Sequence, residues 1–253
     1  MEEYKERSLI DKEKIEPLVS IIVITYNSSK YVLETLESAK AQTYQNIELI
    51  VSDDCSTDNT VEICKKWIEE NKDRFVRTEL ITVNKNTGIT PNFNRGLKVA
   101  EGECVKFIAG DDLLLDNCIT DCMAYVLCNK NCKILFGRIY YLKGNIITPK
   151  PLERIALSNF KEQKKLVYKG SSLPAPASYF NKNALIELGG FDENYLFIED
   201  LPLWLKLVNN NIELSFIDKF VVKYRIHDNN ICMKNGINYI NTKFYNDDEK
   251  IIL

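Results

Sequence analysis

Two pairs of adjacent acidic residues, Asp53-Asp54 and Asp111-Asp112, each follow a run of apolar residues. Two neighbouring carboxylates repel each other, and a bound divalent cation relieves that repulsion. Asp is also common in turns and at helix starts, so either pair could instead begin a helix, as Thr57 and Asp58 do after the first pair. The repetition of the pair after two separate strands favours the interpretation as a cation site.

The apolar run from Val19 to Thr25 is rich in β-branched residues and has the length of a strand. Its continuous apolarity is typical of a strand that is covered on both faces of a parallel sheet. Helical and strand patterns then alternate, with helices expected near residues 31–39, 61–68 and 92–100 and strands at 47–51, 79–83 and 105–109. This order predicts an α/β domain with right-handed crossovers around a central, mostly parallel sheet.

Ligands of such sheets bind at the carboxyl ends of the strands. Tyr26-Asn27, Asp53-Asp54 and Asp111-Asp112 all fall at these ends, so we expect them along one edge of the sheet. Neither a Gly-x-Gly-x-x-Gly turn nor a Gly-Lys-Ser/Thr phosphate loop follows the first strand. A sheet without either glycine motif must hold its ligand in another way, and the carboxylates indicate a cation that grips a diphosphate.

The pattern is harder to interpret beyond about residue 130. A Lys-rich, Pro-punctuated stretch at 143–169 shows no clear period. Regular elements are expected around it, with strands at 134–141, 177–180 and 219–224, a short helix that ends at Leu188-Gly189-Gly190, and a helix at 201–208. Because we find no internal repeat and no flexible linker, we expect one domain at 18–230, with a polar leader at 1–17 and a tail at 231–253.

Five segments, in this order along the chain, resemble motifs of the inverting glycosyltransferase family 2, which has the GT-A fold. They are Ser20–Asn27, Ser52–Asp58, Asn86–Gly88 with Asn94–Gly96, Gly110–Asp112, and Gly189–Asp192 with Glu199-Asp200. Each segment alone is weak, but five in order make a chance agreement improbable. The resemblance implies a GT-A domain whose nucleotide-binding half is 18–115 and whose acceptor-binding half is 116–230.

The resemblance also implies which residues bind the donor. In this family the aromatic side chain at the Tyr26 position stacks on the nucleotide base, and the second carboxylate of the first pair, Asp54, accepts a hydrogen bond from that base. Uridine is the base that this arrangement favours. Asn92 stands where related sequences often carry a residue that contacts the base. We therefore expect these three residues to bind a UDP-sugar.

The metal-binding motif of the family implies that Asp112 ligates Mn²⁺ or Mg²⁺ and that Asp111 faces the ribose. Gly110 stands where a further Asp is common, so the other ligands would be diphosphate oxygens, water and His227. His227 belongs to a segment that resembles a late Tyr-Arg-x-His element, and an exposed loop histidine is the alternative. Arg225 would either help to neutralise the leaving diphosphate or form a structural salt bridge.

The catalytic base of the family is the Asp of a Glu-Asp pair, which is Asp200 in this chain. An inverting transfer needs a carboxylate on the acceptor side to take the proton of the attacking hydroxyl, while the metal stabilises the departing diphosphate. Asp200 precedes Leu201-Pro202, so it also fits the N-cap of a helix, and the two functions are compatible. Glu199 would orient the acceptor or support the loop.

The expected activity is therefore transfer of a sugar to a hydroxyl of a glycan or lipid-linked oligosaccharide, in the synthesis of a cell-surface polysaccharide or glycoconjugate. A non-catalytic nucleotide-sugar-binding subunit of a polysaccharide assembly complex is the alternative, and the presence of Asp54, Asp112 and Asp200 argues against it. A sugar-phosphate nucleotidyltransferase would need a Gly-rich, basic turn after the first strand, and Tyr26-Asn27-Ser28 does not supply one.

The charge of the chain is balanced, with 33 basic and 36 acidic residues and no long basic run, so we do not expect a nucleic acid partner. No apolar stretch approaches the ~20 residues that span a bilayer. Residues 1–16 lack the apolar segment of a secretory signal. We therefore expect a cytoplasmic protein that meets a membrane only peripherally, at its inner face. The sequence does not determine the oligomeric state.

Eight cysteines without a compact framework of paired spacings fit a reducing compartment. Four of them form two pairs spaced by four, which a helix would place on one face as in a metal site: Cys118, Cys122, Cys128 and Cys132. The Cys-x-x-Cys knuckle of structural zinc sites is missing, so we interpret these cysteines as small buried apolar residues.

Overall fold

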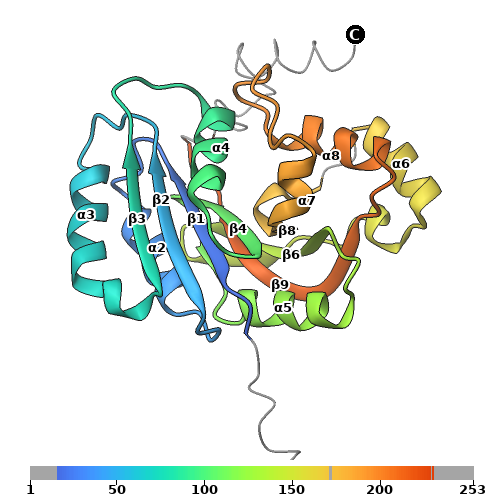
Figure 1. Ribbon diagram of the computed structural model, residues 1–253, viewed down its shortest axis with the longest axis horizontal. Helices are drawn as coiled ribbons and strands as arrows, with labels where there is room; N and C mark the ends of the chain where they lie inside the picture. Colours follow the sequence, from blue (N-terminus) through green and yellow to red (C-terminus); the bar gives the residue numbers. More distant parts are fainter. Residues whose placement is uncertain (1–15, 171–172, 229, 231–253) are drawn as a thin grey trace, which may run out of the picture.

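The computed structural model describes residues 16–170, 173–228 and 230 of the 253-residue chain. The expected tail at 231–253 and all but the last two residues of the expected leader lie outside the described residues. The described residues form a nine-stranded sheet with helices on both faces (Figure 1). The predicted α/β fold around a mostly parallel sheet is confirmed.

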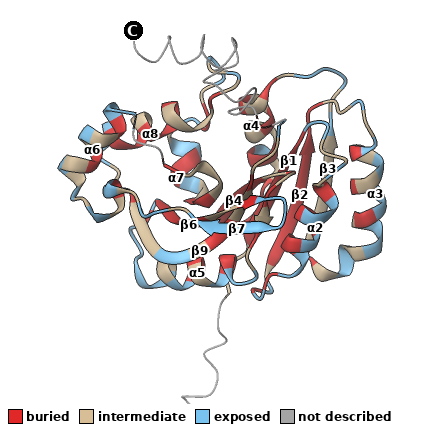
Figure 2. Ribbon diagram, turned by 180° about the vertical axis from the view of Figure 1, so that it is seen from behind, coloured by how far each residue is buried: buried red, intermediate tan, exposed pale blue. Residues whose placement is uncertain are grey.

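The first half of the sheet contains four parallel strands in the order β3-β2-β1-β4. These are β1 (Val19–Thr25), β2 (Ile47–Asp53), β3 (Arg77–Thr82) and β4 (Cys104–Ala109). The helices between them are α2 (Val32–Lys40), α3 (Thr60–Asn71) and α4 (Ile89–Val99). Every residue of β1 and β2 is buried, as the continuous apolarity of β1 predicts (Figure 2). In β2 the buried residues include the polar Glu48, Ser52 and Asp53.

Side chains that alternate along β1 enter two separate cores. Ile21 and Val23 pack with α2, α3 and α5 (Cys118–Cys128) on one face of the sheet. Ile22 and Ile24 pack on the other face with residues of α4, α6 (Phe160–Tyr168), α7 (Lys182–Glu187) and α8 (Asp200–Asn209). The period of two in a strand thus explains why this sheet needs helices on both sides.

The second half of the sheet is mixed. Strand β4 pairs antiparallel with β8 (Ser178–Asn181), β8 pairs antiparallel with β6 (Ile134–Lys143), and β6 pairs parallel with β9 (Ser215–Arg225). Strand β5 (Leu113–Leu114), which directly follows Asp112, pairs antiparallel with β9. This pairing joins the end of β4 to residues that lie more than one hundred positions later in the chain.

The stretch at 143–169, where the sequence shows no period, contains three short elements. They are β7 (Ile146–Pro149), the 3-10 helix η3 (Arg154–Leu157) and α6. Strand β7 pairs only with β6 and all four of its residues are exposed (Figure 2). Elements this short, with little or no buried face, leave no clear hydrophobic periodicity for sequence analysis to detect.

Three of the four closely spaced cysteines are buried in the core, namely Cys118, Cys122 and Cys132. Their interpretation as small apolar residues is confirmed, whereas Cys128 is exposed at the end of α5. In the described part of the chain, no helix is long and apolar enough to cross a membrane.

Gly96 lets α4 pack closely on the centre of the sheet. A Cβ atom at this position would lie 2.4 Å from Cγ2 of Ile22, a buried side chain of β1. We predict that Gly96→Ala lowers the free energy of unfolding by about 1–2 kcal/mol, because the cost of overpacking exceeds the gain of up to about 1 kcal/mol in helix propensity. Urea unfolding measures this difference.

Lys98→Ala is the matched control, because Lys98 is exposed on the same helix. Its unfolding free energy should stay within about 0.5 kcal/mol of the parent protein. A Gly96→Ala variant more stable than the parent would show that α4 does not press against β1 as described.

Candidate active site

The carboxyl ends of β1, β2 and β4 lie level with each other at one edge of the sheet. Thr25 is in register with Asp53, and Ile24 is in register with Ala109. Tyr26 follows directly on β1, and its side chain is half exposed. An aromatic ring with this exposure can stack on a planar ligand. The expected contact between Tyr26 and the nucleotide base stays a prediction.

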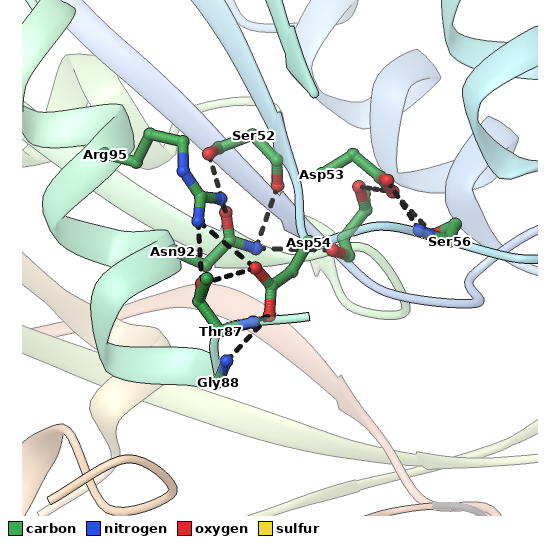
Figure 3. A network of polar contacts seen from close by, with 9 residues as sticks. Ser52, Asp53, Asp54, Ser56, Thr87, Gly88, Asn92 and Arg95 are labelled. Carbon is green, nitrogen blue, oxygen red and sulfur yellow. Dashed lines mark hydrogen bonds and ion pairs between the residues drawn. The ribbon is translucent and has the colours of Figure 1, made fainter. Parts of the chain in front are cut away.

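Asp54 is buried, and its carboxylate accepts hydrogen bonds from the segment that begins α4 (Figure 3). The backbone N–H groups of Thr87 and Gly88 donate to Oδ2 at 2.9 and 2.8 Å, and the Thr87 hydroxyl donates to Oδ1 at 2.6 Å. The Arg95 guanidinium forms an ion pair with Oδ1 at 3.2 Å. These four contacts use most of the acceptor capacity of a carboxylate, so Asp54 holds α4 in addition to any contact with a base.

Asp53 faces away from Asp54, toward the loop after β2 (Figure 3). Its carboxylate accepts hydrogen bonds from the Thr25 hydroxyl at 2.8 Å and from the backbone N–H and hydroxyl of Ser56 at 2.8 and 2.5 Å. The first acidic pair is therefore divided. Asp53 closes a turn, which is the alternative to a cation site that the sequence left open. Asp54 connects β2 to α4.

Asn92 is buried in α4, and its side chain is bonded within the protein. Its Oδ1 accepts from the Ser52 hydroxyl at 2.6 Å and from Arg95 at 2.8 Å, and its Nδ2 donates to the carbonyls of Ser52 and Thr25 at 3.0 and 3.3 Å (Figure 3). A base contact from Asn92 stays a prediction, and it would require one of these four bonds to open.

Asp111 and Asp112 meet the segment that follows β9. His227 Nε2 donates to Asp111 Oδ2 at 2.9 Å, the Arg225 backbone N–H donates to Asp112 Oδ1 at 2.8 Å, and the Arg225 guanidinium donates to the Asp111 carbonyl at 2.7 Å. The late Tyr-Arg-x-His segment therefore lies beside the second acidic pair. The structure joins His227 to Asp111 rather than to Asp112, so a metal bond from His227 stays a prediction.

Asp112 Oδ2 is buried and has no hydrogen-bond partner among the described residues. Burial raises the pKa of Asp112 well above its ordinary value, and the neighbouring charge of Asp111 raises it further. A buried carboxylate oxygen without a partner is costly, and a cation would remove that cost. Asp111, Asp112 and His227 thus offer oxygen and nitrogen donors that fit Mn²⁺ or Mg²⁺.

The described residues contain no group of three or more Asp, Glu, His or Cys side chains arranged to hold a metal ion. The side chains around Asp112 therefore do not form a complete cage in this conformation. The expectation drawn from Gly110, that diphosphate oxygens and water supply several of the ligands, stays a prediction. Mg²⁺ in particular keeps water and ligand phosphates in its coordination shell.

Arg225 is held by residues at the start of α2 that sequence analysis did not assign to the site. Its guanidinium donates to Glu34 Oε2 at 2.7 Å and lies over the ring of Tyr31, 4.5 Å from the ring centroid. The Tyr31 ring also packs on that of His227. The structural salt bridge considered for Arg225 is thus present. Tyr31 directly precedes the helix and is only partly buried, and no motif marks Glu34.

Asp200 is the first residue of α8 and Glu199 directly precedes it, and both are partly buried. Burial raises the pKa of Glu199 to about 8, with a further contribution from the charge of Asp200, and burial also raises the pKa of Asp200. The expected N-cap at Asp200 is wrong, because the helix begins at Asp200 itself and Glu199 precedes it without a side-chain capping bond. The Asp200 carboxylate accepts from the next backbone N–H, that of Leu201, at 2.7 Å.

Helix α4 connects the Asp54 side of the site to the loop that leads to Asp200. Asn94 donates to the Phe191 carbonyl at 2.9 Å and accepts from the Phe191 N–H at 3.0 Å. Thr90 at the start of α4 bonds to the carbonyls of Tyr195 and Leu196. Gly190 leaves room for Asn94, since a Cβ there would lie 2.7 Å from Oδ1 of Asn94. One helix therefore positions both groups of predicted site residues.

The chain is similar to several named glycosyltransferases. It is 28% identical to an uncharacterised glycosyltransferase of Methanocaldococcus jannaschii, with 85% of this chain and 72% of the relative covered. It is 30% identical to an uncharacterised glycosyltransferase of Rickettsia typhi, with 84% of this chain and 65% of the relative covered. Glycosyltransferase GlyG of Streptococcus pneumoniae is 37% identical over 49% of this chain and 39% of its own length.

The fold is similar to that of TarS from S. aureus. The structure of TarS residues 1–349 in complex with UDP-GlcNAc matches with a TM-score of 0.71 and 25% identity, over 92% of this chain and 65% of that one. The chain thus spans about two thirds of TarS 1–349 and of the two uncharacterised relatives, and 39% of GlyG. The similarity to TarS confirms the expected GT-A fold. A family model described as glycosyl transferase family 2 matches residues 20–189. That match covers more than half of the residues of this chain, so the chain belongs to glycosyl transferase family 2.

Proposed function

We propose that this protein transfers a sugar, with inversion, from a UDP-sugar to a hydroxyl of a glycan acceptor. The observation that carries the proposal is the meeting of Asp111 and Asp112 with Arg225 and His227 at the carboxyl edge of the sheet. The complex of the similar TarS protein with UDP-GlcNAc supports a UDP-sugar as donor. The alternative, a non-catalytic nucleotide-sugar-binding subunit, has no observation in its favour.

Tyr26, Asp54 and Asp111 are the residues that we assign to the nucleoside. The half-exposed ring of Tyr26 would stack on uracil, Asp54 would accept from the base, and Asp111 would face the ribose. Arg225 carries a positive charge beside the acidic pair, where it would help to neutralise the leaving diphosphate. Asn92 would contribute to the base pocket mainly by holding Ser52 and Arg95 in place.

A divalent cation, Mn²⁺ or Mg²⁺, would be held by Asp112 with His227. When bound, such a cation stabilises the negative charge that develops on the departing diphosphate. The unpartnered Oδ2 of Asp112 supports this assignment. Because that oxygen is covered in the present conformation, cation binding would require the segment around Asp112 to open.

Asp200 is the residue that we assign as the base. The acceptor oxygen forms a bond to the anomeric carbon, the bond from that carbon to the diphosphate oxygen breaks, and the hydroxyl proton passes to the Asp200 carboxylate. Attack opposite the leaving group converts an α-linked donor into a β linkage. The raised pKa of Asp200 makes its carboxylate a stronger proton acceptor than an ordinary Asp, which suits this function.

The acceptor that we propose is a glycan or lipid-linked oligosaccharide at the cytoplasmic face of the cell membrane, in the synthesis of a cell-surface polysaccharide or glycoconjugate. The family membership and the names of the similar proteins support a glycan product but do not specify the sugar. Sugar selectivity depends on contacts to individual hydroxyls of the donor.

Asp200→Asn should lower kcat for UDP release on the order of 10²–10⁴-fold, because the proton of the attacking hydroxyl loses its acceptor. The UDP dissociation constant should stay nearly unchanged, since Asp200 is assigned to the acceptor side. Steady-state kinetics and calorimetry with UDP measure the two quantities. Asp73→Asn, at an exposed position in the 3-10 helix after α3, is the control and should behave as the parent protein. Undiminished turnover in Asp200→Asn would refute the assignment.

Asp112→Asn should weaken UDP binding on the order of 10-fold or more in the presence of Mn²⁺, because even residues that only support a metal ligand contribute this much. The amide keeps the shape of the side chain and its acceptor for the Arg225 N–H. In EDTA, variant and parent should bind UDP equally. If the Mn²⁺ dependence of UDP binding is the same in both proteins, Asp112 is not a metal ligand.

The pH profile should report the base. Asp200 must be deprotonated to accept a proton, and its pKa is raised, so activity should be present above that pKa and fall as the pH decreases through it. The acid limb of kcat/KM is therefore expected above the ordinary value of about 3.9 for an Asp side chain. A profile that remains flat down to pH 4 would contradict Asp200 as the base.

A further inference from the structure

Helix α6 and the residues before it concentrate positive charge. Residues 150–170 contain six basic and two acidic side chains, in a chain whose net charge is −3. The remainder of the chain is therefore clearly acidic, and this segment opposes it. Such a local excess in an otherwise acidic protein indicates a surface that attracts anions.

Four side chains of α6 form one stripe along the helix. Lys161, Lys164, Lys165 and Tyr168 follow the spacing i, i+3, i+4 and i+7, which places them on one face. Together with Lys169 they line an open hollow of about 490 Å³. We call these five residues the lysine face.

The opposite side of α6 is attached to the domain. Gln163 and Val167 are buried, and Gln163 exchanges two hydrogen bonds with the backbone of Leu214. The Tyr168 hydroxyl donates to Asn209 at the end of α8 at 2.6 Å. These contacts hold α6 in one orientation, so the lysine face points to solvent.

The lysines of this face have little to neutralise them within the protein. In the described part of the chain, the one ion pair found for them joins Lys165 to Glu162 at 3.9 Å, and both of its side chains are substantially exposed. An exposed ion pair at this distance contributes almost nothing to stability and neutralises the lysine only weakly. The repulsion among four neighbouring ammonium groups therefore favours an external anionic partner.

Apolar groups stand beside these charges. The side chain of Tyr168 is 58% exposed, and Leu157 of η3 is 79% exposed. An ion pair of 2.8 Å between Arg154 and Glu162 ties η3 to α6. Lysines with exposed aromatic and aliphatic side chains suit a bilayer surface, where the charges meet lipid phosphates and the apolar groups enter the interface. A soluble polyanion would leave the apolar groups in water.

We propose that the lysine face docks the protein on a membrane that carries anionic phospholipids. Helix α6 lies at the end of the domain opposite α3, in the half that we assign to the acceptor (Figure 1). Docking at this end would bring a membrane-bound acceptor toward that half. The inference itself is independent of the proposed function, because membrane binding is measured without donor or turnover.

The test uses the full chain and vesicles of phosphatidylcholine with about 30 mol% phosphatidylglycerol, which gives the vesicles a negative surface charge like that of an anionic membrane leaflet. We expect K161Q/K165Q to weaken sedimentation with these vesicles on the order of 30-fold, because each lysine near such a surface contributes about fivefold. Parent binding should be absent on pure phosphatidylcholine and should decrease with added salt.

The matched control is K65Q/K66Q, which removes two adjacent exposed lysines from α3 at the other end of the domain. It carries the same change in net charge and should bind vesicles as the parent does. Thermal unfolding should show that both variants are folded. The proposal would be overturned if K161Q/K165Q bound the vesicles as the parent does, or if both variants lost vesicle binding to the same extent. Binding to soluble polyphosphate without binding to anionic vesicles would also overturn it.

Discussion

The buried carboxylate of Asp54 holds the two sides of the candidate site in a common frame. A buried charge that loses its partners costs about 3–5 kcal/mol, so the bonds from Thr87, Gly88 and Arg95 bring the start of α4 firmly to the end of β2. Helix α4 then carries Asn94, which binds both backbone groups of Phe191 in the loop before Asp200. A single satisfied charge thereby connects a residue assigned to the donor with the segment that leads to the proposed base.

The metal side of the site depends on a different long-range contact. The two residues of β5 pair with Val222 and Lys223 of β9, and this brings Arg225 against the backbone and side chains of the second acidic pair. Lys106, buried in β4, donates to the carbonyls of Pro176 and Ser178 and is close enough to lower the pKa of Asp112. Burial outweighs this effect, so the pKa of Asp112 is still raised. Without a cation, the local charges leave that carboxylate poorly compensated.

Charge is distributed unevenly along the molecule, and the distribution fits two different tasks. Burial raises the pKa values of Asp112 at the edge of the sheet and of Glu199 before α8, and such groups suit cation binding and proton transfer. Helix α6 gathers exposed lysines on one face, where they stay hydrated and able to meet an external anion.

The sequence by itself determined the parallel half of the fold and the order of the site motifs. The strand from Val19 to Thr25 was predicted with the bounds that the structure has, because a strand buried on both faces leaves a continuous apolar run. Tertiary structure alone decided the contacts that join distant parts of the chain. It paired β5 with β9, placed Tyr31 and Glu34 beside Arg225, enclosed Asn92 in hydrogen bonds, and turned the lysines of α6 outward. These outcomes depend on contacts between residues far apart in the chain, and local periodicity carries no information about such contacts.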